Sequence, residues 1–324
     1  MSTREKIIEY ITKNRQASGK ELSDYLNDIT SRAIRKQLKN LLDKDLIRKI
    51  GRPPKVYYLI ETNKKPLDID IVDKQTQRTI EDRYLYVSPT GESKPGWEGF
   101  LAWCERTKQD PIKTAKEYIT TIKKFDKFRK KNLIDGMPKM RNTFKDVFLD
   151  KLFYLDFYSI ERFGKTKLGQ MLLYAKQSQS IPLIHELINE IRTKIISLIK
   201  EYKIDGILFI PPTVKREIQF MKELEKLLRL PVSTLSVDKI KTDIIVPQKT
   251  LSKLEDRIEN AKHTIIVADI KQYKNILLID DAVGSGATLN ETAKQIKNKN
   301  LLSGNIIGLA ITGSFKGFDV ISEV

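Results

Sequence analysis

Apolar and polar positions alternate in blocks over the second half of the chain. Amphipathic helical spacing begins at Ile184 and again at Phe220, where apolar residues recur three and four positions apart. Short, largely apolar runs between and after these segments indicate buried strands: Ile207–Ile210, Val232–Val237, Thr264–Ala268, Ile276–Ile279 and Ile306–Ile311. Alternating strands and helices predict an α/β domain over residues 158–324, with a parallel sheet covered by helices on both faces.

A different pattern fills residues 1–62. Apolar residues at helical spacing predict three short helices, and two β-rich runs flank a turn of glycine, proline and basic residues, which is typical of a hairpin. The positions are Ile7–Ile11, Leu22–Leu26 and Ile34–Leu42 for the helices, and Leu46–Ile50, Gly51–Lys55 and Val56–Ile60 for the hairpin. We expect a small separate domain here.

Residues 63–157 are expected to be a linker followed by a mainly helical segment. Glu61–Asp82 is polar, and Asp110 followed by Pro111 is a good helix start. The helix that follows has a lysine-rich face, which is either solvated or a second nucleic-acid surface. Phe144–Ile160 is apolar and aromatic, and we expect it to pack on the next domain.

Composition restricts the class of protein. The 324 residues have a formal net charge of +17 and a pI of about 9.6, which indicates a polyanionic partner. Cys104 is the single cysteine, so neither an intrachain disulfide nor a cysteine zinc ribbon is expected. The chain has no apolar run of membrane-spanning length and no signal-peptide core at its start, so we expect a cytoplasmic protein without membrane contact.

Chemistry concentrates at Asn275–Lys297, where a strand, an acidic pair, a glycine-rich loop and a helix follow one another. Loop amides and a helix dipole bind anions, and glycines let a ligand approach the backbone. Two carboxylates beside a phosphate need hydroxyl or metal partners, so a sugar phosphate fits. The expected helix cap is Thr288 or Asn290. The predicted sugar-phosphate site comprises Asp280, Asp281, Ala282, Val283, Gly284, Ser285, Gly286, Ala287 and Thr288.

Two other phosphate loops fit less well, because a P-loop lysine is missing and Leu289 stands where a dinucleotide loop needs a small residue. The acidic pair and glycine-rich loop, Asp280–Thr288, instead resemble the ribose-5-phosphate loop of type I phosphoribosyltransferases. The alternative is an ordinary βα turn. The resemblance implies phosphoribosyl pyrophosphate with Mg²⁺, Asp280 and Asp281 as catalytic residues, and no direct metal ligand. It also implies a pyrophosphate loop after the first core strand, at Pro212, Thr213, Val214, Lys215 and Arg216, unless these residues are only an exposed helix start.

A third segment is similar to the ComF family of these proteins, through a glutamine, a Leu-Ser pair and an Arg–Asn pair one helical turn apart. The resemblance implies that Gln248, Arg257 and Asn260 form a mobile lid. Tyr174 and Lys176 also resemble a lysine-bearing helix of that family. ComF proteins commonly begin with a zinc ribbon, which this chain lacks.

The first 62 residues resemble winged helix-turn-helix domains. A basic face on the third helix and a basic hairpin would contact the major groove and the DNA backbone. A winged module that contacts protein instead is the alternative. Because such modules bind tightly as dimers, we expect a homodimer. The candidate DNA-binding residues are Arg32, Arg35, Lys36, Lys39, Arg52 and Lys55.

Three functions agree with these features. The first is a DNA-binding regulator that responds to phosphoribosyl pyrophosphate or a nucleotide, a layout similar to the purine repressors of Gram-positive bacteria. The second is an active phosphoribosyltransferase that transfers phosphoribose to a nucleobase-like acceptor. The third is a DNA-handling protein of the competence type. The sequence-reading module at the start favours the regulator.

Overall fold

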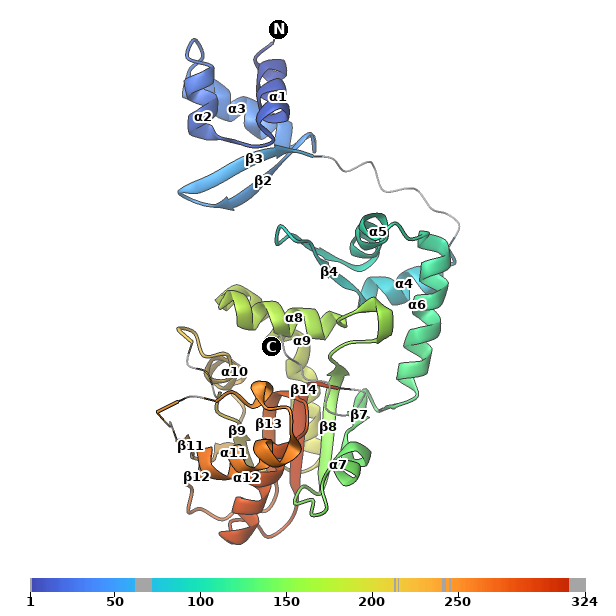
Figure 1. Ribbon diagram of the computed structural model, residues 1–324, viewed down its shortest axis with the longest axis vertical. Coiled ribbons are helices and arrows are strands. Elements are labelled where there is room, and N and C mark those ends of the chain that lie inside the picture. The colour runs from blue at the N-terminus through green and yellow to red at the C-terminus, as the bar shows by residue number, and fades with distance from the viewer. Residues whose placement is uncertain are drawn as a thin grey trace. The chain divides into compact units, whose positions relative to one another are not determined.

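The computed structural model describes residues 2–61, 72–212, 214, 216–240, 243–244 and 246–314. The chain divides into two compact units, Met1–Ile69 and Asp70–Val324. Figure 1 shows the first unit in blue and the second from cyan to red.

The first unit has three helices and a three-stranded antiparallel sheet in the order β1-β3-β2. The predicted helices and hairpin are confirmed. The elements are α1 (Thr3–Asn14), β1 (Ala17–Ser18), α2 (Gly19–Tyr25), α3 (Ser31–Leu42), β2 (Ile47–Arg52) and β3 (Lys55–Ile60).

Local chemistry explains where these helices begin. Ser18 forms a capping box with Glu21 at the start of α2, and the Thr30 hydroxyl accepts the amide of Ala33 at the start of α3. One face of α3 buries Ile34 and Leu38 in the core that the helices share with the sheet. The opposite face of α3 is therefore left to solvent.

The second unit contains the remaining elements. Its helices are α4 (Lys74–Arg83), α5 (Gly96–Arg106), α6 (Pro111–Asp126), α7 (Met137–Thr143), α8 (Lys167–Ser178), α9 (Ile181–Glu201), α10 (Phe220–Leu228), α11 (Leu254–Thr264) and α12 (Ala287–Asn298), with 3₁₀ turns at Glu161–Phe163 and Gln248–Thr250. Its strands are β4 (Leu85–Val87), β5 (Ser93–Pro95), β6 (Arg129–Lys130), β7 (Leu133–Asp135), β8 (Lys151–Phe157), β9 (Gly206–Phe209), β10 (Ser233–Thr234), β11 (Val237–Lys239), β12 (Ile265–Val267), β13 (Ile276–Val283) and β14 (Ile306–Gly313).

A seven-stranded, mostly parallel sheet organises this unit, in the order β10-β9-β13-β14-β8-β7-β6. The five strands from β10 to β8 are parallel, and β7 and β6 add an antiparallel edge. The predicted α/β class, with a largely parallel sheet, is confirmed.

Helices cover both faces of the sheet, and the alternating side chains of β13 show which helices lie on each face. Ile276 and Leu278 pack on the side of α7, α11 and α12. Leu277 and Ile279 pack on the side of α8, α9 and α10 (Figure 1). A strand buried on both faces needs an unbroken apolar run, which is the pattern of this segment.

The structure differs from the expected organisation in three places. The sheet begins before residue 158, because the apolar run at 144–160 contains β8, which pairs with β14 and β7. The polar stretch up to residue 82 contains most of α4, capped by the Asp73 side chain on the Thr76 amide. The expected sheet strand Thr264–Ala268 contains β12, which pairs with β11 in a separate antiparallel sheet.

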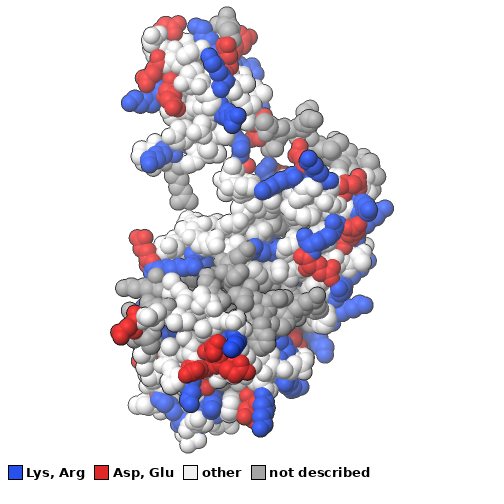
Figure 2. Space-filling view, in the orientation of Figure 1, with Lys and Arg blue, Asp and Glu red and all other residues white. Residues whose placement is uncertain are grey.

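The lysine-rich face predicted on α6 is exposed. Figure 2 shows basic side chains along the edge of the molecule where α6 runs, interspersed with acidic ones. Lys124 of this helix pairs with Glu161, and Glu117 pairs with Arg162. The face is thus of mixed charge.

Candidate functional site

The acidic pair lies at the carboxyl edge of the parallel sheet, where ligands of such sheets bind. Asp280 and Asp281 belong to β13 itself, which continues to Val283. The neighbouring strand β9 ends at Phe209, opposite Ile279. Because that neighbour stops first, both carboxyl groups line a cavity beyond its end.

Asp281 has a partner that the sequence pattern marks only weakly. The ammonium of Lys176, in the last turn of α8, lies 2.6 Å from Oδ2 of Asp281. Arg216 donates to the carbonyl of Lys176 at 2.5 Å, which connects the expected pyrophosphate loop to α8. The lysine neutralises one of the two adjacent carboxylates.

Asp280 differs electrostatically from its neighbour. Burial, followed by the charge of Asp281, raises the pKa of Asp280 to about 7. The nearby charges of Lys176 and Lys239 oppose that rise. Burial also lowers the pKa of Lys239. Near neutral pH, therefore, Asp280 exchanges a proton easily and is able to accept one from a bound molecule.

The glycine-rich loop leads directly into α12. Gly286 is the N-cap, with a φ of +87°, so the expectation of a cap at Thr288 or Asn290 is wrong. Glycine suits this position for two reasons: its φ is left-handed, and a methyl group there would lie 2.5 Å from the sulfur of Met140. Asn290 instead accepts the amide of Phe148 and donates to the carbonyl of Asp146, which anchors the segment before β8.

Loop amides remain free for an anion. Among the described residues, no acceptor takes the amides of Gly284, Ser285 or Gly286, while the Ala287 amide donates to the Ser285 hydroxyl at 3.3 Å. The amides in the first turn of α12 have no intrahelical acceptor, and they form the positive end of the helix dipole. The loop therefore has the donors that a phosphate requires.

Arg257 completes this half of the site. It is 4% exposed, donates through Nε to the Leu251 carbonyl at 2.8 Å, and has a buried Nη2 without a partner among the described residues. Burial lowers its pKa. A buried, incompletely bonded guanidinium is costly unless an anion binds it. This orphaned group points to an anionic ligand.

The three residues expected in the lid do come together. Gln248 donates to the Arg257 carbonyl at 2.9 Å and to Oδ1 of Asn260 at 3.1 Å. The Asn260 amide donates to the Val246 carbonyl at 3.3 Å. Gln248 and Arg257 line the cavity, whereas Asn260 supports them from behind.

The cavity has a volume of about 210 Å³. It is lined by the whole predicted ribose-5-phosphate loop and by Pro212, Val214 and Arg216 from the expected pyrophosphate loop. Thr213 and Lys215 lie outside the described residues. The structure thus places described residues of two predicted loops, and two of the three residues expected in the lid, around one cavity.

Sequence reasoning missed Lys239 and the packing of Met140 on the loop. Lys239 is one of 59 basic residues, and no motif distinguishes it. Only the folded chain brings β11, and with it Lys239, next to Asp280. Met140 lies far from the loop in sequence and ordinarily indicates core packing.

A resident metal site is not formed by side chains alone. In the described part of the chain, no three His, Cys, Asp or Glu residues cluster as metal ligands. The acidic pair provides two carboxylates, and Lys176 already neutralises one of them. These residues fit an Mg²⁺ ion only if a bound phosphate compound supplies most of its oxygen ligands.

Five of the six candidate DNA-binding residues have described side chains, and all five are exposed on the first unit. Arg32, Arg35, Lys36 and Lys39 of α3 are exposed, and Lys55 is exposed at the hairpin. The side chain of Arg52 lies outside the described part of the structure. Arg35 donates to the Ser31 carbonyl at 3.3 Å. One helix face therefore presents four basic side chains to solvent.

The chain matches no protein-family model and no curated protein sequence. Across the described residues, no helix has both the length and the apolarity required to cross a bilayer.

Proposed function

We propose that this protein is a DNA-binding regulator whose second unit binds phosphoribosyl pyrophosphate, with a ComF-like type I phosphoribosyltransferase fold. The observation that supports it most is the unpartnered Nη2 of the Arg257 guanidinium beside the free amides of the loop before α12. The acidic pair lies in the same cavity. An anion-binding group next to a hydroxyl-binding acidic pair favours a sugar phosphate as the ligand.

The roles of the residues follow from their chemistry. The 5-phosphate would lie on the amides of Gly284–Thr288, and the ribose hydroxyls would donate to Asp280 and Asp281. Arg216 and the lid Arg257 would contact the diphosphate, which brings Mg²⁺ with its own oxygens. Binding requires Lys176 to share or leave Asp281, and the diphosphate is a suitable new partner for its ammonium.

The first unit supports the DNA-binding part of the proposal. Its exposed basic helix α3 and the hairpin β2–β3 have the arrangement of a recognition helix and a wing. The net charge of +17 favours a polyanionic partner. We expect the protein to act on duplex DNA as a homodimer.

The decisive experiment measures two affinities in the full chain. A duplex selected from a random pool is titrated with and without phosphoribosyl pyrophosphate and Mg²⁺, and the phosphoribosyl pyrophosphate is titrated separately by calorimetry. We expect binding of both and a ligand-dependent change in duplex affinity. Asp280→Asn with Asp281→Asn should abolish the change, since each charge-assisted hydroxyl contact contributes about 1.5–3 kcal/mol. No binding of phosphoribosyl pyrophosphate by the wild type would refute the proposal.

A second candidate, an active phosphoribosyltransferase, is favoured by one observation. The pKa of Asp280, raised to about 7 by burial and Asp281, suits a group that takes a proton from an acceptor nitrogen at neutral pH. Its test is release of pyrophosphate over a panel of nucleobases.

A further inference from the structure

A second cavity, of about 480 Å³, lies at the opposite end of α8 from Lys176. The start of α8 contributes Thr166 and Lys167, and the end of β8 contributes Asp156 and Phe157. The rest of its lining comes from α4, α6, α8 and α9, from Arg129 of β6, and from the loop residues Asn132 and Ile160. No described residue lines both cavities, so the second cavity is a separate site.

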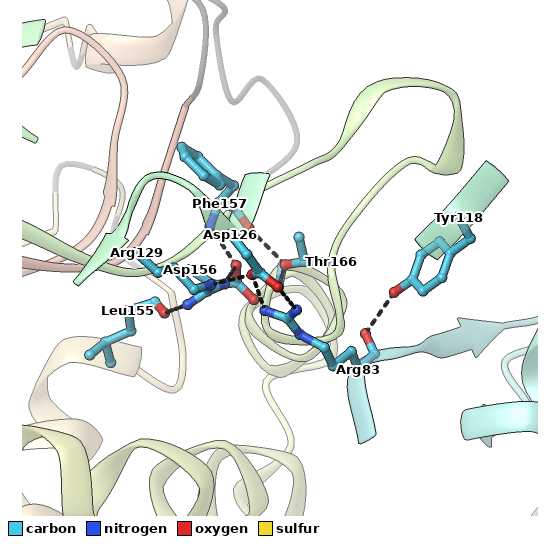
Figure 3. Close-up of polar contacts among 9 residues, drawn as sticks. Arg83, Tyr118, Asp126, Arg129, Leu155, Asp156, Phe157 and Thr166 are labelled. Carbon is cyan, nitrogen blue, oxygen red and sulfur yellow. Dashed lines mark hydrogen bonds and ion pairs between the residues drawn. The ribbon is translucent and has the colours of Figure 1, made fainter. Parts of the chain in front are cut away.

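A charge network forms one wall of this cavity. Arg83 binds Asp126 through two hydrogen bonds of 2.6 and 2.7 Å. Arg129 contacts Asp126 at 3.2 Å and the Leu155 carbonyl at 3.0 Å, and it also pairs with Oδ1 of Asp156. Figure 3 shows these charged groups converging, and it shows the Tyr118 hydroxyl donating to the backbone carbonyl of Arg83. The network holds Asp156 in a fixed position through one of its two oxygens.

Two charged groups in the lining remain incompletely bonded. Oδ1 of Asp156 accepts from Arg129 and from the Phe157 amide, but no described residue donates to Oδ2. The ammonium of Lys194 makes no hydrogen bond or salt bridge with any described residue, and only the nearby charges of Asp156 and Glu190 favour its protonated form. Burial raises the pKa of Asp156 and lowers that of Lys194. One carboxylate oxygen and one ammonium group, both partly desolvated, thus lack hydrogen-bond partners among the described residues of this cavity.

The charge balance, aromatic surface and volume of the cavity indicate the class of ligand that it binds. Its acidic and basic groups balance, so the cavity does not favour a polyanion; they are Asp82, Asp126, Asp156 and Glu190 against Arg83, Arg129, Lys167 and Lys194. Three aromatic side chains, Tyr118, Phe125 and Phe157, add flat apolar surface. The volume lies in the range of small-molecule sites. A planar, uncharged ring with one donor and one acceptor on its edge matches all of these features.

We propose that this second cavity binds a nitrogen heterocycle of the nucleobase class, as the free base or its nucleoside. A ring or exocyclic N–H of the ligand donates to Oδ2 of Asp156. A carbonyl or ring nitrogen accepts from Lys194. The ring lies against the aromatic side chains. The inference is independent of phosphoribosyl pyrophosphate binding, because the two cavities are lined by different residues.

Calorimetric titration of the full chain tests this site, with hypoxanthine, guanine, adenine, uracil and their ribonucleosides as probes. At least one should bind the wild type. Lys194→Met should weaken its binding at least tenfold, and it should leave the fold intact because Lys194 has no hydrogen bond to lose. Lys200→Met, an exposed position on the same helix, is the matched control and should bind as the wild type does.

Further comparisons locate the ligand and establish its class. Asp280→Asn with Asp281→Asn, in the first cavity, should leave heterocycle binding unchanged even if phosphoribosyl pyrophosphate binding is lost. Xanthine should bind more tightly than caffeine, in which methyl groups replace every N–H. The inference is overturned if no probe binds, if Lys194→Met and Lys200→Met bind equally, if the first-cavity variant alone loses binding, or if free amino acids bind and heterocycles do not.

Discussion

Arg257 and Gly284 are neighbours in the lining of the first cavity: a methyl group placed on Gly284 would lie 3.4 Å from Nη1 of Arg257. The guanidinium and the loop amides therefore border the same space. Because Nη2 of Arg257 has no partner among the described residues, that space suits an anion. This relationship connects helix α11 to the loop before α12.

Two neighbouring glycines should respond differently to alanine. Gly284→Ala meets only the ordinary contact with Arg257, so the protein should keep its melting temperature but lose phosphate binding, since the methyl group occupies the ligand space. Gly286→Ala should lower stability by about 1–3 kcal/mol, because its φ of +87° and the sulfur of Met140 both oppose a side chain. Thermal unfolding and calorimetry with inorganic phosphate measure both effects. Equal melting temperatures for the two variants would contradict this account.

Arg257→Met should separate binding from stability. The substitution removes a buried charge that is only partly hydrogen-bonded, so the melting temperature should not fall. Affinity for phosphoribosyl pyrophosphate should fall at least tenfold, from loss of a charge-assisted contact of about 1.5–3 kcal/mol. Lys262→Met, exposed on the same helix, is the control. An unchanged affinity in Arg257→Met would exclude the proposed anion role of this residue.

Ligand affinity should depend on pH through Asp280. Its pKa of about 7 means that the carboxyl group is protonated below neutrality and accepts hydroxyl hydrogen bonds as a carboxylate above it. Binding of phosphoribosyl pyrophosphate should therefore tighten from pH 6 to pH 8. Calorimetry on Asp280→Asn provides the comparison, because ionisation of the ligand itself affects both proteins. A wild-type profile identical to that of the variant would contradict the prediction.

The same carboxyl group should make stability fall as pH rises. Its pKa is raised from 3.8 in the unfolded chain to about 7 in the fold, so the folded protein binds an additional proton between those values. Stability from this group is fully present below pH 3.8 and is lost as the pH approaches 7. Urea unfolding of wild type and Asp280→Asn at pH 5 and pH 8 tests the sign, and the variant should show the smaller loss.

DNA binding should depend on α3 and the hairpin in distinct ways. Arg35→Ala, on the exposed face of α3, should relax sequence preference, whereas Lys55→Ala, at the hairpin, should weaken all duplexes alike. Affinity should fall steeply with salt because phosphate contacts release counterions. Fluorescence anisotropy on matched and scrambled duplexes measures both. A flat salt response would count against DNA as the partner.

Much of this protein follows from sequence alone. The helices and hairpin of the first 62 residues follow from apolar spacing and from caps such as Thr30, which act within one or two turns of chain. The central strand β13 and the anion loop follow from an apolar run, two acids and glycines that are contiguous. Local chemistry specifies these features, so a local pattern is sufficient to find them.

Other features depend on contacts between distant segments. Strand β8 looked like a docking segment, because its aromatic run does not show that β14 and β7 lie on either side of it. The pairing of Lys176 with Asp281 joins residues 105 positions apart, and Lys239 reaches Asp280 only through the separate β11–β12 pair. The N-cap of α12 is Gly286, and Met140, which is distant in sequence, packs against it. Sequence determined which groups are available for the chemistry. The tertiary structure decided their burial and their partners, and therefore the raised pKa of Asp280 and the missing partner of Nη2 of Arg257.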